Sequence, residues 1–91
     1  MMLYGCTSLN SVRIGESVTE IGESAFYGCK TLIGIYVSKN VSFVAKNAFY
    51  GCSSLKNVEY GGTESRKNTV IIANGNDKFS ALFRGSDNDS N

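Results

Sequence analysis

The chain has 91 residues with no histidine, tryptophan or proline, and its formal net charge is +1. This length allows one domain with a modest core, and the near-neutral charge gives no support for binding to nucleic acid or to an anionic membrane. Without histidine the chain lacks the commonest general base and metal ligand, and no apolar run is long enough to insert into a membrane. The sequence therefore predicts no catalytic residue, metal site, cofactor, nucleic-acid partner or membrane insertion.

A Tyr-Gly-Cys triplet recurs with a constant spacing of 23 residues, at positions 4–6, 27–29 and 50–52. Apolar residues around the triplet keep the same spacing, and each copy contains a Leu-x-x-Val-x-Ile pattern or a close variant of it. A fixed period of this length is typical of a solenoid in which each repeat forms one coil. We therefore predict three stacked coils, covering residues 1–23, 24–46 and 47–59 onward.

Each repeat predicts the same succession of elements. The alternating Val-x-Ile segment predicts a short strand with one buried face, and the apolar pair that follows predicts a second extended segment. The Ala-Phe-Tyr-Gly-Cys stretch then predicts a single helical turn, capped by Ser24 or Asn47 and ended by Gly28 or Gly51. Because one coil buries too little apolar surface to offset the lost backbone entropy, the coils must stack to be stable.

The pattern changes from Tyr60 onward. A strand-like stretch at residues 69–73 follows Val58 sooner than the repeat spacing requires, and the Asn-Gly pair after it predicts a tight turn. Residues 79–83 form a last apolar run. We interpret residues 60–83 as a shortened terminal coil that caps the stack, and residues 84–91 as a disordered tail.

Two columns of side chains follow from the repeat. The cysteines are predicted to stack inside the solenoid as small buried residues, because parallel Cβ vectors oppose a disulfide and neither a fourth zinc ligand nor a histidine partner is present. Three unpaired thiols fit a reducing compartment, or burial deep enough to be inert in an oxidising one. The tyrosines are predicted to form a half-exposed column that fills space between coils. The two columns consist of Cys6, Cys29 and Cys52, and of Tyr4, Tyr27 and Tyr50.

The stretches AFYGCKTLIGIYV and AFYGCSSLKNVEY, at their exact spacing, resemble the BspA-type leucine-rich repeat family over residues 1 to about 60. The resemblance implies a right-handed leucine-rich-repeat solenoid with a parallel β-sheet on its concave face. Short extended segments and single helical turns would form the convex face. It also implies a binding role, since many relatives are surface proteins of bacteria and protozoa that adhere to host matrix proteins or cells. By the same resemblance, Ser17, Asn40 and Thr63 are expected to bond the backbone of the turns.

A binding face, if present, is expected on the outward side chains of the strands. Arg13, Tyr36 and Glu59 share one register and predict a row on the concave sheet. Arginine and tyrosine are favoured binding anchors, although such a row can equally be a solvated stack that supports the sheet. Ile33 and Ile71 are predicted to face outward, which favours contact with a partner. The candidate binding residues are Arg13, Ile33, Tyr36, Lys56, Asn57 and Glu59.

Two functional hypotheses follow. In the first, the chain is a non-catalytic protein-interaction module, the C-terminal part of a cell-surface adhesin-like protein, whose partners are a protein ligand and upstream repeats of the same protein. In the second, it is a short structural protein that self-associates, with a homodimer formed through the apolar N-terminal coil around Met2 and Leu3. The chain shows no secretion signal, so the sequence leaves its location open. The cell surface or the extracellular space is expected if it belongs to a longer protein.

Overall fold

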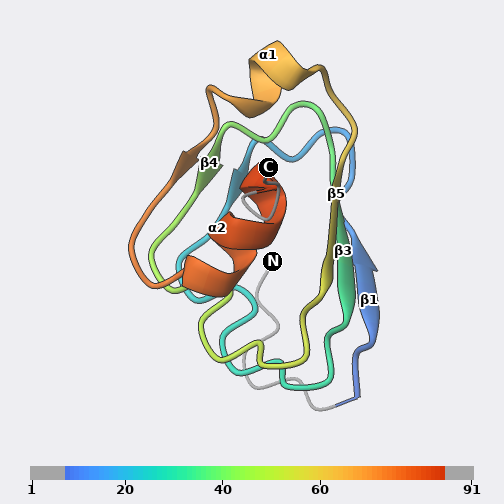
Figure 1. Ribbon diagram of the computed structural model, residues 1–91, viewed down its shortest axis with the longest axis vertical. Helices are drawn as coiled ribbons and strands as arrows, with labels where there is room; N and C mark the ends of the chain where they lie inside the picture. The colour runs from blue at the N-terminus through green and yellow to red at the C-terminus, as the bar shows by residue number, and fades with distance from the viewer. Residues whose placement is uncertain (1–7, 86–91) are drawn as a thin grey trace.

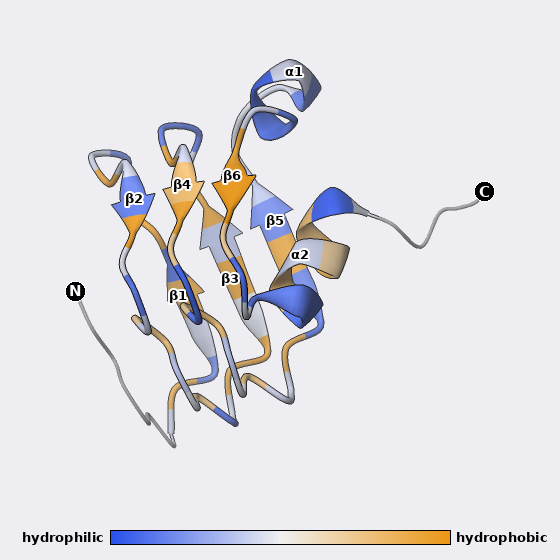
Figure 2. Cartoon of the chain, turned by 90° about the vertical axis from the view of Figure 1, so that its left-hand side faces the viewer, coloured by the Kyte–Doolittle hydropathy of each residue, from blue (hydrophilic) through white to orange (hydrophobic). Residues whose placement is uncertain are grey.

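The computed structural model describes residues 8–85, which form short strands and two helices (Figure 1). In chain order these elements are β1 (Ser11–Arg13), β2 (Glu20–Ile21), β3 (Gly34–Val37), β4 (Phe43–Val44), β5 (Asn57–Tyr60), α1 (Glu64–Lys67), β6 (Ile71–Ile72) and α2 (Asp77–Arg84). Successive strands alternate between two parallel sheets, which we call the first sheet (β1-β3-β5) and the second sheet (β2-β4-β6). Figure 2 shows the second sheet in front of the first, with α2 beside β5 and β6.

The pairing register of the first sheet follows the sequence repeat. Val12 pairs with Ile35, and Ile35 pairs with Val58, so equivalent residues of successive repeats lie side by side. Their side chains point inward, because alternate residues of a strand face opposite sides and the apolar ones gain by leaving water. The strands predicted from the Val-x-Ile pattern are therefore confirmed, and their opposite faces are available to solvent.

The segment after β2 and the segment after β4 are chains of hydrogen-bonded turns rather than capped helical turns. Ser24 and Asn47 have φ angles of 57° and 58°, in the left-handed region, whereas an N-cap residue needs extended backbone. The prediction that they cap a helical turn was wrong for this reason. Gly28 and Gly51 have φ angles of 72° and 81°, so the expectation that glycine ends the segment is confirmed.

Backbone bonds in this segment alternate between the same coil and the next one. The Ala25 N–H donates to Gly22 O at 3.1 Å, whereas the Phe26 N–H donates to Ala48 O at 2.7 Å, one repeat further on. Each coil thus presents N–H groups that need an acceptor from the coil that follows. This requirement matters at the end of the stack, where no further repeat is available.

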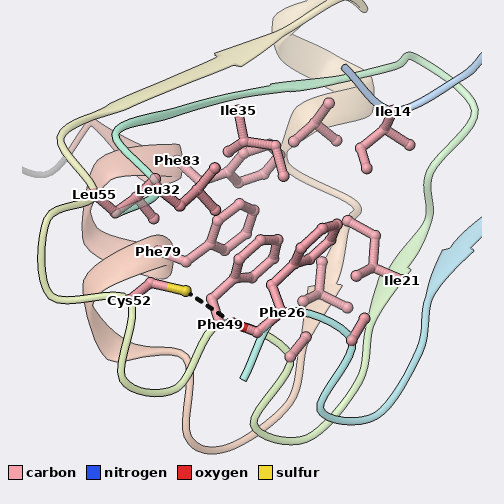
Figure 3. Close-up of a cluster of buried hydrophobic side chains, with 14 of the residues drawn as sticks. Ile14, Ile21, Phe26, Leu32, Ile35, Phe49, Cys52, Leu55, Phe79 and Phe83 are labelled. Carbon is pink, nitrogen blue, oxygen red and sulfur yellow. Dashed lines mark hydrogen bonds between the residues drawn. The ribbon is translucent and has the colours of Figure 1, made fainter. Parts of the chain in front are cut away.

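The core lies between the two sheets and contains a column of stacked phenylalanines (Figure 3). The ring centroids of Phe26 and Phe49 lie 5.3 Å apart, and those of Phe49 and Phe79 lie 4.3 Å apart, with interplanar angles of 10° and 7°. Phe79 belongs to α2 and not to a repeat. It therefore occupies the place that the phenylalanine of a further coil would take, and Phe83 continues the column at 5.4 Å.

The last strand corrects the prediction for the C-terminal part. β6 pairs with β4 through Phe43 to Ile71, so it belongs to the second sheet and is not an early equivalent of β5. Asn57 and Ile71 are 14 positions apart, compared with nine between Gly34 and Phe43, so this half-coil is lengthened rather than shortened. The extra residues form α1, whose first turn is capped by the Thr63 hydroxyl, which accepts from the Arg66 N–H at 3.1 Å.

Arg84 was predicted to begin the disordered tail, but it ends α2. Its guanidinium donates to Lys67 O at 2.9 Å and to Val70 O at 2.6 Å, which ties the helix to the chain around α1. The remaining tail residues, 86–91, lie outside the described residues. The same is true of Met2, Leu3, Tyr4 and Cys6.

Candidate functional site

The outer face of the first sheet carries the row that the repeat spacing predicts. Arg13 pairs with Tyr36 and Tyr36 with Glu59, so the three side chains leave adjacent strands at one level. The Arg13 guanidinium carbon lies 4.2 Å from the centroid of the Tyr36 ring, a cation–π contact. Arg13 and Glu59 are exposed and Tyr36 is half-buried. The row thus offers a cation, an aromatic ring and a carboxylate in order across the sheet.

Two glycines shape the surface around Tyr36. Its hydroxyl lies against Gly61, where an added Cβ would collide with it, so Gly61 leaves room for this ring position. Gly34 in β3 has no side chain, and it lies between Ser11 and Asn57 of the neighbouring strands. Residues of all three strands line a hollow here of about 300 Å³. The face therefore has a depression beside a fixed aromatic ring.

The six candidate binding residues divide between two places. Arg13, Tyr36, Asn57 and Glu59 line the hollow on the first sheet. Ile33 and Lys56 instead line a second hollow of about 520 Å³, together with residues such as Asn10 and Lys78.

Exposure alone does not assign an apolar residue to the candidate face. Ile33 is 42% exposed and Ile71 is 64% exposed, so the prediction that both face outward is confirmed. Ile71, however, pairs with Phe43 in the second sheet and lies away from the Arg13–Tyr36–Glu59 row.

Cys29 and Cys52 are buried thiols of the core, as predicted. The Cys52 thiol donates to Phe26 O at 3.2 Å (Figure 3). Burial, and then the neighbouring Cys29, raise the pKa of the Cys52 thiol to about 11. A thiol that stays protonated at neutral pH is a poor nucleophile and a poor metal ligand. Within residues 8–85, no group of three or more His, Cys, Asp or Glu side chains could hold a metal ion.

The expected bonding of turns by polar side chains is confirmed at Asn40. Its Nδ2 donates to Glu16 O at 2.6 Å, in the turn of the preceding repeat. Thr63, at the equivalent place one repeat later, serves α1 as its cap.

Sequence reasoning missed Asn76, which is only 2% exposed. Its Oδ1 accepts from the Phe49 N–H at 2.8 Å, and its Nδ2 donates to Ala45 O and to Ala73 O, both at 2.9 Å. The amide thus takes the role that a backbone carbonyl of the next coil plays for Phe26. The signal for Asn76 is the Phe49 N–H, a buried backbone donor that needs an acceptor from the segment after the last repeat.

Comparison with known proteins agrees with this architecture. A family model for the BspA type leucine rich repeat region matches residues 1–74 in six copies. The chain belongs to the BspA-type leucine-rich repeat family. The family resemblance inferred from the repeated motif is thereby confirmed, and the two parallel sheets fit a leucine-rich repeat fold.

A solved structure is also similar to this leucine-rich repeat chain. It is a leucine rich cell surface protein from Faecalibacterium prausnitzii, with 38% sequence identity and a TM-score of 0.71 over 78% of this chain. The match covers 19% of that protein, so this chain spans about a fifth of its length. No protein of curated function matches the chain significantly. The family and the structural neighbour are those of repeat proteins and indicate no enzyme family. Among residues 8–85, no helix is long and apolar enough to cross a membrane.

Proposed function

We propose that this chain is a non-catalytic protein-interaction module of a longer cell-surface leucine-rich repeat protein with an adhesin-like role. The module would bind a protein ligand through the outer face of the first sheet, as the concave face of a right-handed solenoid. The observation that carries the proposal is the exposed Arg13–Tyr36–Glu59 row beside its hollow. The cell-surface part is supported by the similar protein from Faecalibacterium prausnitzii.

The chemistry of the row suits a protein partner. Arginine and tyrosine are enriched among residues that dominate interface energies. Arg13 already rests on the Tyr36 ring, so less side-chain freedom is lost when a ligand binds. Arg13 and Glu59 are two strand spacings apart, about 10 Å, and their opposite charges would fix the orientation of a ligand.

The two ends of the stack differ in a way that supports a place at the C-terminal end of a longer solenoid. At the N-terminal end, a mostly apolar hollow of about 80 Å³ is lined by Ile14, Ile21 and Phe26, which are only 1–3% exposed. The half-buried Val18 and the exposed Glu20 also line it, and a preceding coil would fill it. At the other end, α2 buries Phe79 and Phe83 and exposes polar side chains. Upstream repeats are therefore the partner that best fits the apolar end.

Binding of the isolated chain to purified extracellular-matrix proteins, measured by biolayer interferometry, tests the proposal. Arg13→Glu and Tyr36→Ala should each weaken binding of any matrix ligand by at least about tenfold, because each removes an anchor from the face. Lys46→Glu is the matched control, since it makes the same change of charge at an exposed position two residues after β4. A ligand whose affinity is unchanged by both first-sheet variants would contradict this role of the row.

The structural alternative is favoured by one observation, the apolar hollow at the N-terminal end. If a second copy covers that hollow, Val18→Glu should change the sedimentation-equilibrium mass of the chain, whereas Arg13→Glu should not. A monomeric wild-type chain at high concentration would exclude the homodimer and leave upstream repeats as the partner.

A further inference from the structure

Two columns of aromatic rings run side by side through the repeats. Phe26 stacks on Phe49 inside the core, and Tyr27 stacks on Tyr50 at the surface, with ring centroids 5.4 Å apart and an interplanar angle of 27°. The phenylalanine column continues into α2 through Phe79. Within residues 8–85, the tyrosine column ends at Tyr50, which is 54% exposed. The C-terminal segment thus extends the phenylalanine column but leaves the tyrosine column without a further ring.

A hollow of about 220 Å³ lies where the tyrosine column ends. Tyr50 and Ser53 line it from the last repeat, and Gly75, Asp77 and Lys78 line it from the turn before α2 and from the first turn of this helix. An aromatic surface is therefore bordered by a carboxylate, an ammonium group and a hydroxyl.

The walls of this hollow are held in place by backbone contacts. Gly75 has a φ angle of 86°, and an added Cβ there would collide with the Asn47 side chain. The Asn47 N–H donates to Asn74 O at 2.9 Å, and Asn76 is bonded to Phe49 as described above. These contacts fix the backbone of the hollow, from which the exposed side chains of Ser53, Asp77 and Lys78 extend.

We propose that this hollow binds one pyranose ring of a neutral glycan, with the C–H face of the sugar on the Tyr50 ring. A pyranose combines an apolar face with a rim of hydroxyl groups that both donate and accept hydrogen bonds. The rim of the hollow matches it, since Asp77 accepts, Lys78 donates and Ser53 does both. The opposite charges of Asp77 and Lys78 cancel, which favours a neutral sugar over a charged one.

An aromatic side chain from a protein partner could extend the tyrosine column equally well by stacking. It carries at most one polar group to pair with those that border the hollow, however, whereas a sugar has a hydroxyl for each of the three. The chemistry of the rim therefore favours the glycan. This site is separate from the row on the first sheet and does not depend on the function proposed for that row.

Saturation-transfer NMR with the full chain tests the proposal. The probes are methyl β-D-glucopyranoside, methyl β-D-galactopyranoside and N-acetylglucosamine at millimolar concentration, with p-cresol as the aromatic comparison. At least one sugar should show saturation on the C–H protons of one ring face. Tyr50→Ala should weaken its binding by about tenfold or more, and Tyr50→Phe, which keeps the ring, should retain it.

Two further variants complete the test. Asp77→Asn should weaken sugar binding several-fold by removing the charged acceptor. Ile71→Thr, which removes an even more exposed apolar residue from the second sheet, should leave sugar binding unchanged, and circular dichroism should show that each variant is folded. The proposal is overturned if no sugar binds, if folded Tyr50→Ala binds as well as the wild type, or if p-cresol binds at Tyr50 and no sugar does. The last result would assign the hollow to an aromatic side chain of a protein.

Discussion

Replacement of Asn76 by alanine should destabilise the protein by about 2–4 kcal/mol. The change leaves the buried Phe49 N–H without its acceptor, which costs about 1–3 kcal/mol. Ala45 O keeps its bond from the Ala48 N–H at 3.2 Å, and the half-buried Ala73 O is accessible to water, so these two carbonyls lose less. Because proteins of this size have a free energy of unfolding of about 5–15 kcal/mol, the loss is a large part of the total.

Urea unfolding followed by far-UV circular dichroism measures this effect through the midpoint and the slope of the transition. The melting temperature should fall by about 10–20 °C. Asn74→Ala is the matched control, because it removes an asparagine side chain two residues away that is exposed, and it should cost less than about 0.5 kcal/mol. Asn76→Asp adds a second test, since it keeps an oxygen for the Phe49 N–H but places a buried carboxylate oxygen against Ala45 O and Ala73 O.

At neutral pH, Asn76→Asp should cost at least as much stability as Asn76→Ala, because its buried carboxylate has no partner in place of the lost amide donors. Asn76 is the N-cap residue of α2, but its side chain makes no capping hydrogen bond, so helix capping does not account for the effect. A loss below 1 kcal/mol for Asn76→Ala, equal to that of Asn74→Ala, would refute the argument that this amide closes the stack.

Four further predictions concern the core and the candidate face. Phe79→Ala should lower the free energy of unfolding by about 3–5 kcal/mol, measured in urea, because it removes the ring stacked on Phe49; a loss under 1 kcal/mol would show that α2 does not close the core. Cys52 should resist alkylation in the folded protein at pH 8 and react after unfolding, as measured by peptide mass spectrometry, and rapid native labelling would contradict its burial. Since its folded pKa of about 11 exceeds the ordinary 9.0, its contribution to stability is present below pH 9 and lost between pH 9 and 11, a difference that a Cys52→Ala variant should remove. Gly61→Ala should displace the Tyr36 hydroxyl and weaken a first-sheet ligand several-fold, while changing stability by less than about 1 kcal/mol; unchanged affinity would separate Tyr36 from binding.

The stacked strands could be predicted because the repeat itself dictates their register. Val12, Ile35 and Val58 are equivalent in sequence and become neighbours in space, so burial of one implies burial of the others. The turns were less predictable, because Ser24 and Asn47 fit an N-cap by residue type and adopt left-handed backbone instead. The residue type alone does not decide between the extended backbone of an N-cap and the left-handed backbone found here.

The segment after the repeats, residues 60–85, was predicted least well. It does not keep the 23-residue spacing from which the other elements were predicted. β6 belongs to the second sheet because the chain first forms α1, and nothing in residues 60–70 repeats an earlier segment. Asn76 directly follows the Asn-Gly pair that predicts a tight turn, and no sequence pattern indicates that its side chain bonds residues of the previous coil.

The candidate face was predicted in part. Alternation along a strand correctly gave the exposed sides of Arg13 and Glu59. It placed Ile33 and Lys56 on the same face, whereas these residues precede the strand residues Gly34 and Asn57 and line the second hollow instead. The period-2 rule holds only within the paired residues.

The way in which Asn76 and Phe79 meet the last coil has a consequence for how such proteins change length. Each coil offers its successor the same two features, an N–H that needs an acceptor and the face of a phenylalanine ring. The closing segment satisfies both from outside the repeat. When whole repeats are duplicated or deleted, the C-terminal segment that carries Asn76 and Phe79 therefore need not change, because it fits whichever coil becomes the last. Loss of part of a repeat would instead shift the register and expose the core side of the strands.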